Sequence, residues 1–286
     1  MKFRKKIIKL LNEFLNEDIG TGDVTTDSTA PADLKIHGEF IAKQKGIIAG
    51  LEVIKLLFSL IDKASKVQSN IRDGDSVLAG HIIATITGSA RGILKGERTA
   101  LNILQRMSGI ATLTNQYVNA VKGTLAVILD TRKTAPGLRI FDKWAVSIGG
   151  GQNHRFGLYD MILIKENHIN IAGSITHAVQ RVRHKYNNRY FVEVEVRNLD
   201  ELEEAIGLKP DRIMLDNMSI SQLEEAVRMN NGQIPLEASG NINLGNIRKI
   251  AEAGVNYISI GSITHSVQAL DISLILEEKI NFYQKK

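Results

Sequence analysis

The sequence predicts a two-part α/β protein, in which a strand-rich first domain precedes an α/β barrel. Short β-branched runs alternate with polar helical segments through the second half of the chain. The last four runs, which begin at Tyr190, Asp211, Pro235 and Tyr257, lie 21, 24 and 22 residues apart. Fully apolar strand centres indicate parallel strands covered by helices, and the regular spacing favours a barrel over a doubly wound sheet.

Composition and charge limit the classes of function. The 286 residues are 43% hydrophobic and 23% charged, which suffices for one large or two modest globular domains. The net charge of +5 suggests an anionic ligand. Aromatic residues make up only 5% and the basic residues are dispersed, so we expect no nucleic-acid partner. The chain contains no cysteine, which excludes disulfides, thiolate nucleophiles and cysteine metal sites.

The first 18 residues are expected to form an amphipathic helix, because Ile7, Leu11 and Leu15 recur at helical spacing. Their basic start resembles a signal peptide, but polar residues interrupt the apolar run and no small-residue cleavage site follows. We therefore expect a cytoplasmic protein. No run approaches the ~18 apolar residues of a membrane span, and we expect no membrane partner.

The rest of the first domain is expected to contain short strands and turns around one helix. Strands are predicted within residues 37–50 and 81–88, a helix over 51–61 and a turn over 71–80. A long helix is then predicted over 96–121, where apolar residues recur at helical spacing, with Ser108-Gly109 as the candidate position for a bend.

Polar or charged residues follow nearly every strand of the predicted barrel, and barrel enzymes carry their active sites at these carboxyl ends. Glu193 and Glu195 alternate on one strand and therefore point the same way, so an inward pair would require cations across the barrel. The strand ends carry, in order, Thr131-Arg132-Lys133, Lys165, Glu195, Asp216, Ser239-Gly240-Asn241 and Gly261-Ser262.

These residues offer three kinds of binding group. Glu195 and Asp216 suit Mg²⁺, which takes one or two carboxylates together with substrate phosphate oxygens. The turns at 239–241 and 261–262, each expected just before a helix, suit a phosphate group. His154 and Arg155 follow a triple glycine and, with Lys165, could form a donor cluster for a carboxylate or phosphate. Solvated cations and ordinary glycine turns are the simpler explanations.

Several motifs are absent from the sequence. There is no P-loop, no complete dinucleotide fingerprint and no HExxH pair, which argues against an NTPase, a nicotinamide dehydrogenase and a zinc hydrolase. Phosphoribosyl transfer uses all three kinds of binding group. A sugar-phosphate lyase or aldolase with Lys133 or Lys165 as a Schiff-base lysine is one alternative. A non-catalytic polyanion-binding protein is another, suggested by the basic pI near 9.2.

Eight sequence blocks, in order and without a large gap, give the chain a specific resemblance to the quinolinate phosphoribosyltransferase family of NAD biosynthesis. The blocks are EDIGTGDVTT (17–26), GERTALNILQRMSGIAT (96–112), DTRKTAPGLR (130–139), GGGQNHRFGLYDMILIKENHI (149–169), VEVEV (192–196), MLDN (214–217), EASGNI (237–242) and GSITHS (261–266).

The resemblance implies a fold, an assembly and a reaction. The fold would be an N-terminal α/β sandwich over residues 1–110, completed by 267–286, and an open barrel of the type II phosphoribosyltransferase kind over 111–266. The enzyme would be a homodimer whose active site is shared between subunits. It would transfer phosphoribosyl from phosphoribosyl pyrophosphate to quinolinate with decarboxylation, using Mg²⁺ and no organic cofactor.

The resemblance also implies a role for each site residue, although the role of His265 stays open. Lys133, Lys165, Glu195 and Asp216 would be catalytic. Quinolinate would be bound by Arg98 of the neighbouring subunit, Arg132, His154 and Arg155, with Lys133 and Lys165 between the two substrates. Glu195 and Asp216 would hold Mg²⁺ and the ribose hydroxyls, and Ser239, Gly240, Asn241, Gly261 and Ser262 would bind the 5′-phosphate.

Overall fold

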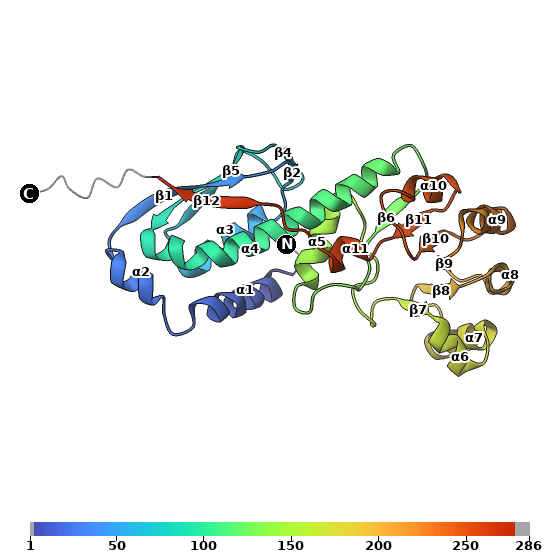
Figure 1. The fold of residues 1–286 in the computed structure, drawn as a ribbon. Helices are drawn as coiled ribbons and strands as arrows, with labels where there is room; N and C mark the ends of the chain where they lie inside the picture. The colour runs from blue at the N-terminus through green and yellow to red at the C-terminus, as the bar shows by residue number, and fades with distance from the viewer. Residues whose placement is uncertain (1–2, 278–286) are drawn as a thin grey trace, which may run out of the picture. The chain divides into compact units, whose positions relative to one another are not determined.

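A computed structural model of the chain describes residues 3–277. Its contacts form two compact units (Figure 1), of which unit 1 contains residues 3–113, 135–150 and 266–277, and unit 2 contains 114–134 and 151–265. The predicted domain boundaries at 110/111 and 266/267 stay predictions, and the contact grouping differs from them over 135–150, which packs in unit 1. The predicted contribution of residues 278–286 lies outside the described residues.

Unit 1 is built on a four-stranded antiparallel sheet of order β12-β1-β5-β3. The strands are β1 (Lys35–Ala42), β3 (Lys66–Gln68), β5 (Ile82–Ser89) and β12 (Ile272–Leu276). In β1 every second residue is buried, as expected for a strand with one covered face. Two further short strands, β2 (Gly46–Ile47) and β4 (Ser76–Val77), pair with each other, so the turn predicted over 71–80 contains a strand.

The first two predicted helices of unit 1 are confirmed. Helix α1 (Arg4–Ile19) buries its apolar stripe, and α3 (Leu51–Ile61) has the predicted bounds. Phe58 of α3 packs on Phe40 of β1 with ring centroids 6.3 Å apart. Short helix α2 (Val24–Thr29) and helix α5 (Arg139–Ile148) complete the unit, and Phe14 of α1 contacts Phe141 of α5.

Helix α4 (Ala90–Ala120) begins six residues before the predicted start and continues without interruption through Ser108 and Gly109. Gly109 admits a close approach of the returning chain. A Cβ atom there would lie 3.0 Å from the carbonyl carbon of Gln268 and closer still to its oxygen. Only glycine fits this packing without a shift of the backbone.

Unit 2 contains the predicted parallel sheet, with six strands in the order β6-β11-β10-β9-β8-β7. Within residues 3–277, β6 and β7 are the ends of this sheet and no strand joins them, so the barrel is open. The strands are β6 (Val127–Leu129), β7 (Ile162–Ile164), β8 (Val192–Val196), β9 (Arg212–Asp216), β10 (Leu236–Ser239) and β11 (Tyr257–Ser259).

From β7 to β11 one or two helices lie between each pair of successive strands, and those between β7 and β10 lie along one face of the sheet (Figure 1); one more short helix follows β11. Three of them begin with a polar cap: Ser174, Asn198 and Ser219 each accept a backbone N–H from the first helical turn. Among the described helices, none combines the length and the apolar composition needed to cross a lipid bilayer. The helices are α6 (Glu166–Ala172), α7 (Ile175–Tyr186), α8 (Leu199–Leu208), α9 (Ile220–Asn230), α10 (Ile247–Glu252) and α11 (Ser262–His265).

Candidate active site

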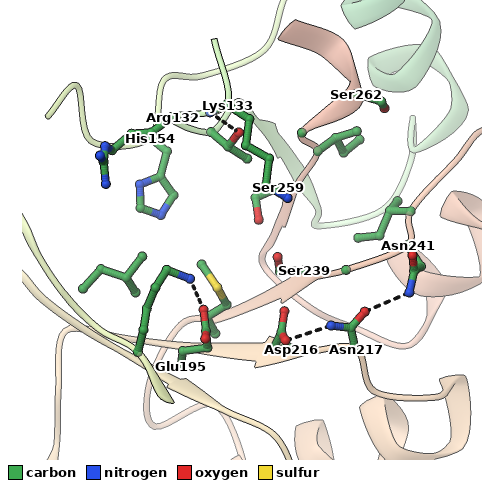
Figure 2. Close-up of a pocket in the computed structure, with 18 of the residues that line it drawn as sticks. Arg132, Lys133, His154, Glu195, Asp216, Asn217, Ser239, Asn241, Ser259 and Ser262 are labelled. Atoms are coloured by element: carbon green, nitrogen blue, oxygen red, sulfur yellow. Dashed lines mark hydrogen bonds and ion pairs between the residues drawn. The ribbon is translucent and has the colours of Figure 1, made fainter. Parts of the chain in front are cut away.

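The carboxyl ends of the barrel strands surround one cavity of about 800 Å³ in unit 2. Cations gather at one end of it, amide and small residues at the other, and two carboxylates lie between them (Figure 2). Twelve of the thirteen predicted site residues line the cavity: Arg132, Lys133, His154, Arg155, Lys165, Glu195, Asp216, Ser239, Gly240, Asn241, Gly261 and Ser262. His265 lines it too, whereas Arg98 is an exposed residue of α4 in unit 1.

The cationic end is organised by Asp130, a fully buried residue that follows β6. Its carboxylate accepts the backbone N–H of His154 at 2.8 Å and the side-chain amide of Asn153 at 2.7 Å. These bonds fix the loop that carries His154 and Arg155. Burial, and then the positive charge of Arg132, lower the pKa of Arg155. An anionic ligand at this end would relieve the repulsion between the two guanidinium groups.

His154 has a defined tautomer. The backbone N–H of Arg155 donates to its Nδ1 at 2.7 Å, so the ring proton lies on Nε2. That nitrogen lies 3.0 Å from the carboxylate of Glu193 and 3.6 Å from that of Glu237. The imidazole thus lies beside the buried glutamates on one side and is hydrogen-bonded to its loop on the other.

Glu193 and Glu237 lie beneath the cavity, and both are fully inaccessible to solvent. Arg212 donates to Glu237 at 2.8 Å, while its guanidinium stacks 4.0 Å from the Tyr257 ring. Burial and the neighbouring charge of Glu193 raise the pKa of Glu237 to about 7, and burial raises that of Glu193 as well. Arg212 thus supplies a cation to Glu237, and the charges of Arg212, Lys165 and Arg155 also act on Glu193.

His154, Glu193 and Glu237 place possible ligand atoms within 4.8 Å of one another, close enough to hold a metal ion. The guanidinium of Arg212 already supplies a positive charge to Glu237. A divalent cation there would lie beside that guanidinium, and the repulsion makes this group better suited to ion pairing than to metal binding.

The central carboxylates lie at the ends of neighbouring strands: Glu195 is the last residue but one of β8, and Asp216 is the last residue of β9. Glu195 forms an ion pair with Lys165, and Asp216 accepts a hydrogen bond from Asn217 at 2.8 Å. Hard carboxylate oxygens facing an open cavity are suitable ligands for Mg²⁺. The donor set therefore fits the predicted ion.

The opposite end of the cavity is formed by the turns after β10 and β11. Gly240 and Asn241 have positive φ angles of 98° and 51°. The prediction that a helix directly follows Asn241 is wrong, because a turn intervenes and α10 begins at Ile247. After β11 the prediction is correct, since α11 begins at Ser262. Thr264 of α11 donates to the backbone oxygen of Lys133 at 2.9 Å, which fixes the Lys133 segment beside this turn.

Sequence reasoning missed four residues that shape the site: Asp130, Arg212, Asn217 and Glu237. A signal for Glu237 was present, because it lies two residues before Ser239 on one strand and therefore points to the same side. Asp130 and Asn217 end or follow strands and could have been found in the same way. The position of Arg212 beside Glu237 depends on strand register, which the sequence alone did not give.

Two family models match most of the chain. The model described as the quinolinate phosphoribosyl transferase N-terminal domain matches residues 23–108, and that of the C-terminal domain matches residues 110–275. The chain belongs to the quinolinate phosphoribosyltransferase family. The resemblance seen in the eight sequence blocks is confirmed.

Individual members of this family are similar along nearly the full chain. A chloroplastic nicotinate-nucleotide pyrophosphorylase (carboxylating) of Arabidopsis thaliana is 45% identical over 295 residues, covering 96% of this chain and 83% of that protein. A probable nicotinate-nucleotide pyrophosphorylase (carboxylating) of Bacillus subtilis (strain 168) is 45% identical, covering 93% and 92%. The crystal structure of NadC from Streptococcus pyogenes has a TM-score of 0.92 at 40% identity, covering 96% and 97%. The predicted fold class is confirmed.

Proposed function

We propose that this member of the quinolinate phosphoribosyltransferase family transfers the phosphoribosyl group of phosphoribosyl pyrophosphate to the ring nitrogen of quinolinate. The products are nicotinate mononucleotide, pyrophosphate and CO₂, as in de novo NAD biosynthesis. The observation that carries the proposal is the division of one cavity into a cationic end, a central pair of carboxylates and an end formed by small and amide residues.

The cationic end suits quinolinate, a pyridine with two adjacent carboxylates. Arg132 and Arg155 lie close enough for each to affect the other electrostatically, and a dicarboxylate would neutralise both. Asp130 fixes the backbone of His154 and the Arg155 N–H orients its ring, so the imidazole bounds this end in a defined orientation. Holding the ring by its carboxylates directs its nitrogen toward the ribose carbon C1.

The other end suits the ribose 5-phosphate part of the second substrate. Glycines at 240 and 261 let backbone N–H groups approach a phosphate, and Ser239, Asn241 and Ser262 add side-chain donors. Glu195 and Asp216 would bind the ribose hydroxyls and Mg²⁺. When bound, Mg²⁺ would neutralise the developing charge on the pyrophosphate leaving group.

The reaction has two bond exchanges. The quinolinate nitrogen forms a bond to C1 of the ribose while the bond from C1 to pyrophosphate breaks, and nearby carboxylates stabilise the oxocarbenium-like transition state. The bond between ring C2 and its carboxylate then breaks to release CO₂. The electron pair left on C2 is stabilised by the adjacent pyridinium nitrogen and is quenched by a proton. Lys133 and Lys165 hold positive charge between the two substrates.

The assembly and the location belong to the proposal as well. We infer a homodimer in which Arg98 of one subunit completes the quinolinate end of its partner's cavity, because the motif around Arg98 resembles the family's. We also infer a cytoplasmic enzyme, although the Arabidopsis relative is named chloroplastic. Quinolinate and phosphoribosyl pyrophosphate are its partners in this proposal, with no nucleic acid and no membrane.

The two alternative functions have less support from the site. Lys165, one of the two candidate Schiff-base lysines besides Lys133, is in an ion pair with Glu195, whereas Schiff-base formation needs the free amine. A polyanion-binding surface does not require a cavity with inward carboxylates. Both alternatives leave the family's eight sequence blocks without a role.

The test is incubation of the purified protein with quinolinate, phosphoribosyl pyrophosphate and Mg²⁺. Nicotinate mononucleotide is followed by absorbance and mass, and nicotinate serves as a control substrate. We expect product from quinolinate only. Absence of product from a folded dimer would overturn the proposal, and trapping of a substrate adduct by borohydride would favour the lyase.

A further inference from the structure

Asn217 joins two parts of the cavity that come from different strands. Its side-chain nitrogen Nδ2 donates to Oδ2 of Asp216 at 2.8 Å, and its oxygen Oδ1 accepts from Nδ2 of Asn241 at 3.0 Å (Figure 2). Asn241 in turn accepts, through its backbone oxygen, the side-chain amide of Asn246. A single amide group thus uses both of its ends to connect a central carboxylate with the turn after β10.

The backbone around Asn217 is built for this position. Asn217 adopts the left-handed conformation with φ 56°, which asparagine tolerates better than most residues. Its backbone N–H donates to the carbonyl of Ser239 at 2.9 Å, which ties the end of β9 to the end of β10. The side chain therefore starts from a fixed point between the two strand ends.

Gly240 makes room for the same side chain. A Cβ atom at position 240 would lie 2.5 Å from Cγ of Asn217 and closer still to its Oδ1. Because no real Cβ makes such a contact, the glycine is required by Asn217 as well as by its own φ of 98°. The turn after β10 and the residue after β9 fit each other sterically.

We propose that Asn217 is a positioning residue that connects Asp216 to the turn at 239–241. It would thereby fix the distance between the groups that bind the ribose and those that bind its 5′-phosphate. The inference rests on the proposed function. The amide donates to one carboxylate oxygen of Asp216 and leaves the other oxygen for a ribose hydroxyl or Mg²⁺. The same side chain also accepts a hydrogen bond from the side-chain amide of Asn241 and so fixes the orientation of that amide. The cationic end comes from other strands, so quinolinate binding does not depend on this amide.

Two variants separate the contributions. Asn217→Asp keeps the shape and an oxygen for Asn241, but it loses the donor to Asp216 and places a second carboxylate beside it. Asn217→Gly removes both bonds and still permits the left-handed backbone. Asn231→Gly is the matched control, because Asn231 is an exposed asparagine with φ 45° at the end of α9, outside the cavity.

The experiment measures binding and turnover of the full chain. Ribose 5-phosphate without metal and quinolinate are titrated by calorimetry, and KM for each substrate is measured with Mg²⁺. For Asn217→Asp we expect affinity for ribose 5-phosphate and kcat/KM for phosphoribosyl pyrophosphate to fall about tenfold or more, as when a hydrogen bond to a charged group is lost. The dissociation constant of quinolinate should change less than about twofold.

Asn231→Gly should leave unchanged the dissociation constants of ribose 5-phosphate and quinolinate and the kinetic constants for both substrates. Equal losses for both substrates in the Asn217 variants would indicate a merely structural role, and unchanged constants would remove the role altogether; either result overturns the inference. If the unaltered protein forms no nicotinate mononucleotide, the proposed function fails. The ribose 5-phosphate titrations still decide whether Asn217 positions the ribose and phosphate sites.

Discussion

Replacing Glu237 by Gln should remove a large part of the pH dependence of stability. The structure raises the pKa of this buried carboxyl group to about 7, first through burial and then through the charge of Glu193. A pKa raised above the ordinary 4.5 means that the folded chain binds the proton more tightly than the unfolded chain. The resulting stability is fully present below about pH 4.5 and is lost as the pH rises through about 7.

The magnitude follows from the size of the shift. Each unit is worth about 1.4 kcal/mol, so raising the pH from 5 to 8 should cost the wild-type protein about 2 to 3 kcal/mol through Glu237. Glutamine resembles the protonated acid and cannot ionise. Between pH 5 and pH 8 the unfolding free energy of Glu237→Gln should therefore rise by this amount relative to that of wild type. The weakened bond to Arg212 lowers the unfolding free energy of the variant by an amount that is the same at every pH.

The assay is urea-induced unfolding at several pH values between 5 and 8, followed by tryptophan fluorescence and circular dichroism. The control is Glu203→Gln, at an exposed position of α8, whose unfolding free energy should run parallel to that of wild type. If the curve of Glu237→Gln also runs parallel, the raised pKa is wrong. Coincidence of the two probes checks that unfolding is a single transition.

Three further predictions concern substrate binding, assembly and packing. Arg132→Ala should weaken quinolinate at least about tenfold and phosphoribosyl pyrophosphate little, because it removes a charged contact at the cationic end; equal losses in calorimetry would contradict this. Mixing inactive Arg98→Ala with inactive Glu195→Ala should restore part of the activity if subunits share a site, and proven mixed dimers without recovery would exclude sharing. Gly109→Ala should lower the unfolding free energy by about 1 to 3 kcal/mol in thermal unfolding, because its Cβ would overlap the Gln268 backbone. Gly207→Ala, in open space within α8, should instead raise the unfolding free energy by about 0.5 to 1 kcal/mol.

The sequence predicted the elements of the fold whose patterns are local. The β-branched runs became the six parallel strands, and the spacing of Ile7, Leu11 and Leu15 predicted the buried stripe of α1. Residues 135–150 could not be placed by such patterns. Their grouping with unit 1 depends on long-range contacts such as that between Phe14 and Phe141.

The candidate site was predictable for a related reason. The carboxyl ends of parallel strands meet at one edge, so Arg132, Glu195 and Asp216 had to converge once the barrel was recognised. The partners of Glu237 were not predictable, because side chains on neighbouring strands meet only in the correct register. Their roles toward substrates stay predictions.

The way in which β12 completes the sheet of unit 1 has a consequence for synthesis on the ribosome. Strand β1 pairs with β5 soon after both have emerged, but its other edge pairs with residues 272–276, which emerge only after the segments of unit 2 have been made. Until then β1 presents unpaired backbone groups, a template for pairing with other nascent chains. A chaperone that shields this edge, or slow translation of the codons between β5 and β12, would therefore alter the yield of native protein without changing any property of the folded protein.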